Sequence, residues 1–252
     1  MIKTIDELFT LDEKRTSLIK KGDISSLKKT YSITHKVDND NTASFWTNRL
    51  EKETYSMDYM KIDRINTVSE YLIKYSKKNN LNIGVGDGEL ERELKVLSND
   101  TEIIGLDITY SGLKDALQKT DFPAICSSIK DLPFKKDSLQ LVSVLEVLEH
   151  LIFSEILDVL DSINSILKKN GYLLISVPVN EKYSSSYNPN RHYRRYSGEL
   201  IMEELKMSGF EILEFEYLFA FSKYYYLKKY LARSLLKKRW QPNVIIIVAR
   251  KT

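Results

Sequence analysis

Residues 81–90 have the sequence LNIGVGDGEL, in which an apolar run ends at three glycines in alternate positions: Gly84, Gly86 and Gly88. A segment that favours a helix follows at once, from Glu89. Glycine permits positive φ and lets a ligand approach the bare backbone. The N-terminus of the helix behind it offers free N–H groups and a partial positive charge. We therefore predict a strand, a tight turn and a helix that together hold a small polar ligand.

The spacing of these glycines distinguishes two kinds of nucleotide site. A dinucleotide fingerprint, G-x-G-x-x-G, would need its third glycine at position 89, which is Glu89. The pattern G-x-G-x-G resembles instead motif I of the class I S-adenosylmethionine (SAM) methyltransferases. The resemblance implies SAM as the cofactor and a cofactor-binding turn made of five residues: Gly84, Val85, Gly86, Asp87 and Gly88.

Composition limits the class of protein. The 252 residues can bury a substantial core, and a net charge of +3 is too small to indicate a nucleic-acid partner by itself. No apolar run approaches the roughly 18 residues that span a bilayer. Acids near the N-terminus and a single cysteine, Cys126, indicate a cytoplasmic location. We expect Cys126 to be buried.

Apolar strand patterns alternate with helical patterns along the chain. Strands are expected at residues 81–83, 102–107, 122–127, 139–145, 172–177, 210–218 and 244–248, and helices at 57–76, 89–97, 111–119, 153–169 and 199–207. Such alternation predicts an α/β fold with helices on both faces of the sheet. The fold class is Rossmann-like: a seven-stranded, mostly parallel sheet with an antiparallel C-terminal hairpin strand.

We divide the chain into residues 1–55, an N-terminal helical appendage and cofactor-covering segment, and residues 56–252, the methyltransferase domain. Thr4 and Glu7 form a capping box, and Gly22 ends the first helix. This helix serves packing or a homodimer contact. Phe45 and Trp46 resemble the aromatic pair that often covers the cofactor in the family, although core packing is the simpler interpretation.

Two strand ends supply further candidate SAM contacts. Asp107, followed by Ile108, ends a strand where a carboxylate can accept both ribose hydroxyls. The alternative is an Asp that forms a turn or caps the next helix. Residues 127–134 resemble the Gly-Asp-Ala-x-x-Leu-Pro-Phe segment of the family. The resemblance implies that Ser128 replaces the adenine-binding acid and that Ile129 supplies an amide and an apolar wall.

Residues 145–151 have the sequence LEVLEHL, which closely resembles a segment of the ubiquinone-type and related small-molecule methyltransferases (methyltransferase type 11). The resemblance implies that Leu145 and Glu146 lie beside the methionine part of SAM. It also places His150 at the methyl group, where an imidazole can accept a proton from the acceptor. The alternative is a His that caps the next helix.

The second hypothesis is a methyl transfer that is assisted by a metal ion. Glu146, Glu149, His150 and the downstream His192 resemble the divalent-metal site of certain O-methyltransferases, including some that act on RNA 3′ ends. The same string is common in relatives without a metal. We therefore predict no metal and keep His150 and His192 as the catalytic candidates.

Residues 180–196 form a long polar segment at the ligand-facing edge, as a substrate lid would. The candidate acceptor contacts are Tyr193, Arg194, Arg195 and Tyr196, whose arginines suit an anionic acceptor. The alternative is that Ser197 caps a helix and the arginines pair with surface acids.

Residues 221–240 form a basic insertion with seven Lys and Arg and no acid. Tyr224, Leu227, Tyr230, Leu231 and Leu235 are expected on its apolar face. A basic amphipathic helix can bind an anionic membrane or a nucleic acid. The favoured interpretation is a helix whose lysines are solvated and whose tyrosines pack on the sheet or on a second subunit.

Three positions that are commonly acidic in the family are neutral here: Asn82, Ser128 and Gln140. These departures leave room for a scaffold that has lost SAM binding. The leading hypothesis is a SAM-dependent methyltransferase that acts on oxygen or nitrogen of a small-molecule acceptor. The alternative acceptors are RNA and a membrane lipid.

Overall fold

A computed structural model describes residues 1–50, 59–76, 78–98, 100–234 and 239–252. Positions 57–58 of the helix expected at 57–76 and positions 235–238 of the insertion lie outside the described residues, as do positions 51–55 of the predicted N-terminal unit. No helix in these described ranges is long and apolar enough to span a bilayer.

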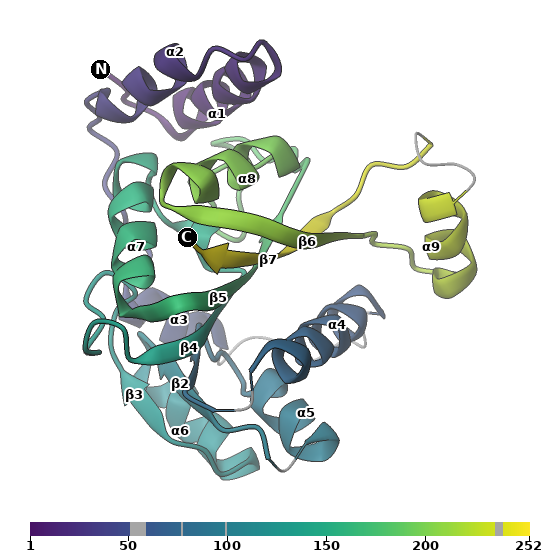
Figure 1. The fold of residues 1–252 in the computed structure, drawn as a ribbon. Helices are drawn as coiled ribbons and strands as arrows, with labels where there is room; N and C mark the ends of the chain where they lie inside the picture. The colour runs from purple at the N-terminus through teal and green to yellow at the C-terminus, as the bar shows by residue number, and fades with distance from the viewer. Residues whose placement is uncertain (51–58, 77, 99, 235–238) are drawn as a thin grey trace.

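The described residues form one seven-stranded sheet in the order β3-β2-β1-β4-β5-β7-β6 (Figure 1). The strands are β1 (Asn80–Ile83), β2 (Ile103–Asp107), β3 (Ala124–Cys126), β4 (Leu139–Leu145), β5 (Leu167–Pro178), β6 (Phe210–Leu218) and β7 (Val244–Lys251). Strands β1 to β5 pair in parallel, and β7 runs antiparallel to both β5 and β6. The predicted fold class is confirmed.

Helices cover both faces of the sheet. They are α1 (Ile5–Lys20), α2 (Ile24–Lys29), α3 (Ala43–Leu50), α4 (Tyr59–Tyr75), α5 (Glu89–Leu97), α6 (Tyr110–Lys119), α7 (Phe153–Ile166), α8 (Gly198–Met207) and α9 (Tyr225–Ser234). Short 3₁₀ turns lie at η1 (Thr30–Ser32) and η2 (Leu148–His150). Helices α7 and α8 pack on one face, and α4 and α5 pack on the other (Figure 1).

The two apolar layers follow from the two-residue period of a strand, which sends alternate side chains to opposite faces. Leu173 and Ile175 of β5 join the layer under α7 and α8, whereas Leu174 between them joins the layer under α4 and α5. Both faces are buried, so the central strands carry apolar residues on both sides, and their polar residues, such as Asn82 and Ser143, are buried as well.

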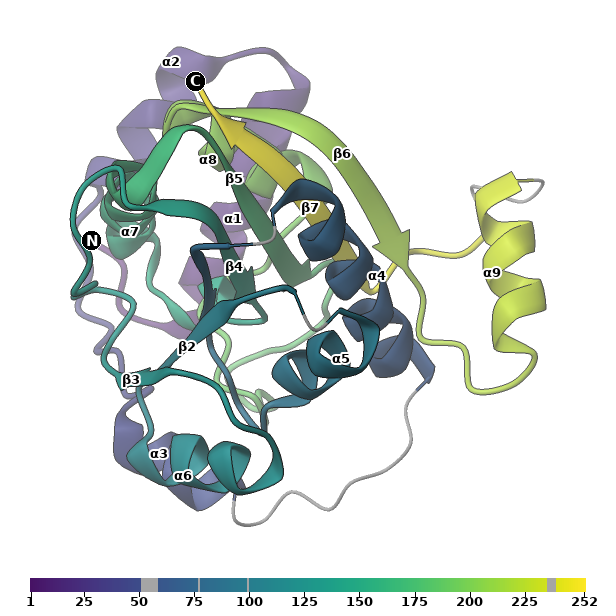
Figure 2. The same ribbon diagram turned by 60° about the horizontal axis from the view of Figure 1, so that its bottom comes forward.

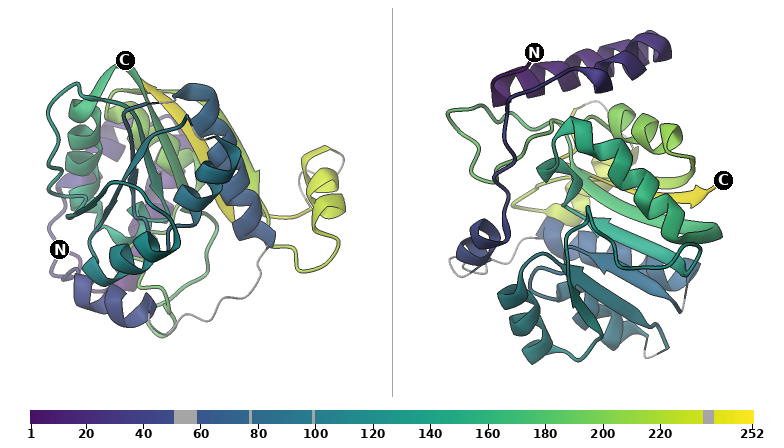
Figure 3. Two further views of the ribbon diagram at one scale, coloured as in Figure 1. Left: turned by 90° about the horizontal axis from the view of Figure 1, so that it is seen from below. Right: turned by 90° about the vertical axis from the view of Figure 1, so that its left-hand side faces the viewer.

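The N-terminal residues form a separate layer outside α8. Helix α1 begins at the predicted capping box, in which Thr4 and Glu7 are both engaged, and Gly22 follows its end with φ +73°. Helices α1 and α2 lie across α8, and an extended segment then runs down one side of the molecule to α3 (Figure 3).

Three sequence-based expectations are wrong. Helix α7 ends at Ile166, and Asn170-Gly171 lies inside β5, where the pairing with β4 is irregular, instead of capping the helix. Cys126 is exposed because β3 is an edge strand.

The third wrong expectation concerns α9, which projects away from the sheet (Figure 2). Its side toward the domain carries Tyr225 and Lys229, which both bond Asp63 of α4. Three of the apolar residues predicted to pack are instead exposed: Tyr224 is 77%, Leu227 59% and Tyr230 64% accessible, whereas Leu231 is partly buried. The predicted Leu235 lies outside the described residues.

Candidate functional site

The glycine turn lies at the carboxyl edge of the sheet, between β1 and α5. Gly84, Gly86 and Gly88 all have positive φ, at +86°, +58° and +76°. A Cβ on Gly84 would overlap Val147 Cγ2, and one on Gly88 would lie 2.9 Å from Ala116 Cβ. A Cβ on Gly86 would meet no atom of the described residues within 4 Å. The outer two glycines therefore permit packing, and the middle one borders open space.

Asp107 ties the end of β2 to this turn. Its Oδ2 accepts a hydrogen bond from the Gly86 N–H (3.1 Å), and its Oδ1 accepts from the backbone N–H and the hydroxyl of Thr109 (2.8 and 2.7 Å). The turn-forming contact, which was part of the alternative interpretation, is thus present, whereas the N-cap residue of α6 is Thr109 and has no side-chain capping bond. A carboxylate has about four acceptor positions, so these three bonds leave one for a ligand hydroxyl.

The other predicted cofactor residues gather at the same edge. Ile108 is partly exposed next to Asp107, and Ser128, whose Oγ accepts from the Lys130 N–H (3.2 Å), is half-buried beside the buried Ile129. Asp87 follows Gly86 and has a buried carboxylate oxygen, with its nearest cation, Arg92, at 3.7 Å.

Leu145 and Glu146 end β4 on the other side of the turn. Leu145 packs against the layer under α4 and α5. Glu146 has φ +53°, and its carboxylate accepts from Ser176 Oγ (2.8 Å) and pairs with Arg64 of α4 (3.1 Å). Both oxygens of Glu146 are therefore occupied by protein groups.

The neutral residue at position 82 has a structural reason that sequence reasoning missed. The buried Asn82 donates from Nδ2 to Glu91 Oε1 (2.8 Å) and accepts from Ser143 Oγ (2.9 Å). Burial raises the pKa of Glu91 to about 7. A second acid at position 82 would repel this carboxyl, whereas an amide both donates and accepts. No signal in the α5 sequence marked Glu91 as a buried residue.

A second cluster lies beyond the ends of β4 and β5. It contains Glu149, His150 and His192, whose nearest carboxylate or ring-nitrogen atoms all lie within 4.8 Å of one another. Burial raises the pKa of Glu149, and the negative charge of Glu146 raises it further. Burial, and then the neighbouring His192, lowers the pKa of His150 to about 3. His150 is therefore neutral at physiological pH.

The N-terminal segment covers this cluster rather than the glycine turn. Asn39 and Asn41 both donate from Nδ2 to the His150 carbonyl (3.1 and 3.2 Å). The Trp46 ring meets the His150 ring edge to face, with centroids 4.6 Å apart. The contact of Trp46 with His150 is a packing contact, and the covering of the cofactor by this segment stays a prediction.

Three of the four predicted acceptor contacts of the 180–196 lid are buried elsewhere. Arg194 is 1% exposed and pairs with Asp12 of α1 (3.0 Å) and Glu204 of α8 (2.5 Å). Tyr196 receives a bond from Arg194, and Tyr193 donates to Asp40. These side chains hold the N-terminal layer to the domain, which does not fit acceptor contact.

Arg195 is the only one of the four with a partly exposed side chain. It pairs with Glu13 of α1 and lines a groove of about 1060 Å³ between α1, α8, β6 and α9. Both arginines therefore pair with acids, as the alternative interpretation stated, except that the acids paired with Arg194 are buried and not on the surface. Ser197 caps α8 as the same alternative stated.

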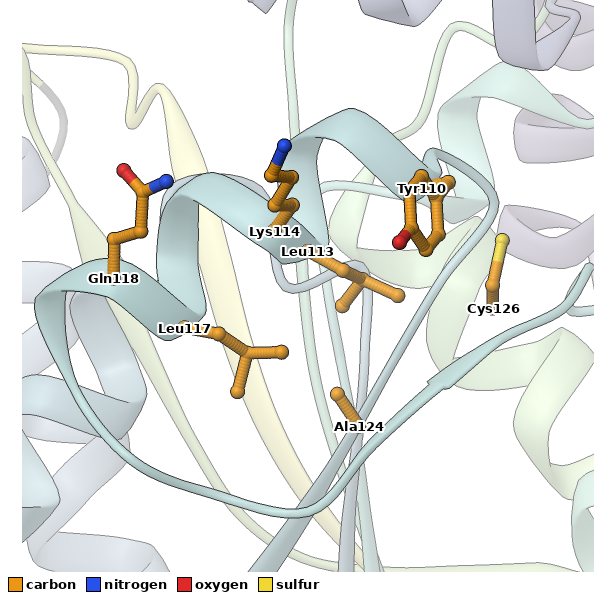
Figure 4. Close-up of a pocket in the computed structure, with 7 residues that line it drawn as sticks. All are labelled: Tyr110, Leu113, Lys114, Leu117, Gln118, Ala124 and Cys126. Carbon is orange, nitrogen blue, oxygen red and sulfur yellow. The ribbon is translucent and has the colours of Figure 1, made fainter.

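A separate apolar cavity of about 380 Å³ lies between α6 and β3 (Figure 4). Leu113, Leu117 and Ala124 line it, and Tyr110 and Cys126 lie at one end. None of the predicted cofactor residues lines this cavity, so we assign the site from the glycine turn and not from this cavity.

Comparison with known proteins gives one family and two relatives by sequence. Residues 81–175 match the family model described as "Methyltransferase domain". The uncharacterized protein MJ0638 of Methanocaldococcus jannaschii is 27% identical over 178 residues, which is 69% of this chain and 75% of that protein. A second protein of that organism, MJ1252, is 34% identical over 98 residues, 38% of this chain and 36% of that protein.

Solved structures share the fold. The [4+2]-cyclase SpnF has a TM-score of 0.61 at 16% identity, with 83% of this chain and 92% of that chain covered. The N-methyltransferase NodS from Bradyrhizobium japonicum WM9, in complex with S-adenosyl-L-homocysteine, has a TM-score of 0.61 at 14% identity, covering 84% and 99%. A SAM-dependent methyltransferase from Archaeoglobus fulgidus scores 0.57 at 21%, covering 74% and 94%.

Proposed function

We propose that this chain, whose residues 81–175 match the methyltransferase domain family, is a SAM-dependent methyltransferase acting on oxygen or nitrogen of a small-molecule acceptor. The observation that carries this proposal is the glycine turn at the carboxyl edge of the sheet, where ligands of open α/β sheets bind. The fold alone does not assign a reaction, since the cyclase SpnF has the same fold.

The residues at this edge fit SAM. The open space beside Gly86 and the remaining acceptor position of Asp107 suit the ligand backbone and a ribose hydroxyl. Ile108, Ser128 and Ile129 would border the adenine, and Leu145 and Glu146 the methionine part. When bound, SAM supplies an electrophilic methyl group on a sulfonium.

The acceptor would lie against His150 and His192. The two imidazole rings meet edge to face, with centroids 4.8 Å apart, and the Trp46 ring packs on the His150 ring. Because methyl transfer is an in-line displacement, holding the acceptor atom in line supplies much of the acceleration. We assign His150 and His192 to that positioning, and Arg195 to the outer end of the groove beside the lid.

The test is isothermal titration of the chain with SAM and with S-adenosylhomocysteine, repeated on Asp107→Ala. The control is Asp115→Ala, an exposed acid on α6 of the same charge. We expect micromolar binding in the wild type and in the control, and its loss in Asp107→Ala. Absence of binding by folded wild-type protein would refute the proposal and favour the non-catalytic scaffold.

A second candidate function follows from the exposed face of α9. Tyr224, Leu227 and Tyr230 are exposed, and residues 221–240 contain no acid. Aromatic side chains beside lysines suit the interface of an anionic membrane, which would supply a lipid acceptor. We expect binding to phosphatidylglycerol vesicles that weakens with salt, and none to phosphatidylcholine. Binding to RNA but not to vesicles would favour a nucleic-acid acceptor.

A further inference from the structure

Glu91 of α5 is bonded across the glycine turn to the strand that precedes it. The turn begins where β1 ends and finishes where α5 begins, and Glu91 lies in the first turn of that helix. Its Oε1 accepts a hydrogen bond from Asn82 Nδ2 of β1 (2.8 Å), and Asn82 Oδ1 accepts from the Ser143 hydroxyl of β4 (2.9 Å). All three side chains are buried. These bonds therefore join the residues on both sides of the turn to which we assign the cofactor.

The second carboxylate oxygen of Glu91 takes no part in these bonds. Oε2 is buried and has no hydrogen-bond partner among the described residues. A glutamine would accept the bond from Asn82 with its own Oε1 and would avoid the cost of burying an acid. What a glutamate adds at this position is a charge that can be gained and lost. Packing does not require this charge, so it needs another explanation.

The charged residues around Glu91 belong to α5, to β2 and to α4, which packs on α5. They are Arg92 of α5, Asp107 of β2, and two cations of α4 that pair with other acids, Lys61 with Glu89 (2.9 Å) and Arg64 with Glu146 (3.1 Å). The groups from β1 and β4 are an amide and a hydroxyl, which do not titrate. Burial, opposed by the Asn82 bond and by Arg92 and reinforced by Asp107, raises the pKa of Glu91 to about 7. The carboxyl is therefore mostly protonated at about pH 6 and mostly ionised at about pH 8.

We propose that Glu91 is a specificity residue of the cofactor site, whose negative charge makes the site bind SAM more tightly than S-adenosylhomocysteine. This inference rests on the proposed function, because it requires that the glycine turn holds the cofactor. The two ligands differ by one methyl group and by one positive charge, since SAM carries a sulfonium and S-adenosylhomocysteine a neutral thioether. Charges about 10 Å apart at an effective dielectric constant of about 20 change an affinity by roughly tenfold. Such a difference favours release of the product over release of the substrate.

The experiment is isothermal titration of the full chain with SAM and with S-adenosylhomocysteine at about pH 6 and about pH 8. The ratio of the two affinities should rise in favour of SAM about fivefold more in the wild type than in Glu91→Gln, because the ionised carboxyl is lost in the variant. The ligands are the same in both titrations, so their own protonation cancels. The matched control is Glu93→Gln, which removes an equal charge from a half-buried acid of the same helix and should behave as the wild type.

Two further readouts distinguish a charge effect from a loss of packing. A sulfonium near Glu91 lowers the pKa of the carboxyl, so at about pH 7 the wild type should release roughly 0.4 of a proton more than Glu91→Gln when SAM binds. Titrations in buffers of different ionisation enthalpy measure this release, and S-adenosylhomocysteine should show no such difference. The double variant Asn82→Asp/Glu91→Gln moves the acid to the other end of the same hydrogen bond. It should restore the preference for SAM at about pH 8 that Glu91→Gln loses.

The proposal would be overturned by an affinity ratio that changes equally with pH in the wild type and in Glu91→Gln, or by equal proton release from the two proteins. A folded double variant without the SAM preference would also contradict it. Circular dichroism of each variant checks the fold. Binding of both ligands with no effect of Glu91→Gln would refute the role of Glu91 alone. Binding of neither ligand by folded wild-type protein would refute the proposed function, and this inference with it.

Discussion

Alanine substitutions at Gly84 and Gly86 should impair different properties, although the two residues lie in one turn: Gly84→Ala mainly lowers stability, and Gly86→Ala mainly abolishes ligand binding. Both have positive φ, so each alanine introduces backbone strain of about 1–2 kcal/mol. At Gly84 the new Cβ also overlaps Val147 Cγ2, and overpacking adds about 1–3 kcal/mol. Gly84→Ala should therefore lower the free energy of unfolding by about 2–5 kcal/mol, and Gly86→Ala by about 1–2 kcal/mol.

Among molecules that remain folded, Gly86→Ala should impair ligand binding more than Gly84→Ala does. Among the residues that the structure describes, no atom lies within 4 Å of the Cβ of Gly86→Ala, so it projects into the space assigned to the cofactor. We expect Gly86→Ala to remain folded but to lose S-adenosylhomocysteine binding in a titration. Urea unfolding followed by circular dichroism measures the stability of both variants. In a double-mutant cycle, Val147→Ala should recover the overpacking part of the loss in Gly84→Ala.

Two results would contradict this reasoning. Equal stability losses at Gly84 and Gly86 would show that the overlap with Val147 does not matter. Wild-type affinity in Gly86→Ala would show that the ligand does not approach the middle of the turn.

Three further predictions concern stability and exposure. Burial raises the pKa of Glu91 from 4.5 to about 7, so the stability contributed by its neutral form is full below about pH 4.5 and is lost as the pH rises through 7. At pH 8, Glu91→Gln should therefore have a free energy of unfolding higher than that of the wild type by up to about 3 kcal/mol in urea unfolding. Equal stability of the two proteins at pH 8 would contradict this. Arg194→Ala should lower the free energy of unfolding by about 3–5 kcal/mol, whereas substitution of its partly exposed neighbour, Arg195→Ala, should lower it by only about 1 kcal/mol. Similar losses for the two variants in thermal or urea unfolding would contradict the stabilising role of the buried ion pairs of Arg194. Cys126 should react with a thiol reagent in the native protein at the rate seen in urea, whereas a slow native reaction would mean that the strand edge is covered.

The sequence by itself determined those features that depend on neighbouring residues. The capping box of Thr4 and Glu7 and the glycine turn at 84–88 are local, because they depend on φ angles and on hydrogen bonds within a few residues. The fold class was predictable for a similar reason, since apolar strands alternating with helices allow few arrangements. The neutral residue at position 82, in contrast, was noticed but could not be explained.

Only the tertiary structure decided which polar groups meet. Arg194 is bonded to Asp12, 182 residues earlier in the chain, so no local pattern distinguished it from its half-exposed neighbour Arg195. Glu149 and His150 meet His192 because β4 and β5 are adjacent and end at one edge. The apolar side of α9 faces outward because Tyr225 and Lys229 bond Asp63 on α4. Burial and pairing across the fold are properties of the packed molecule, and they determine which of the candidate residues are free to bind a ligand.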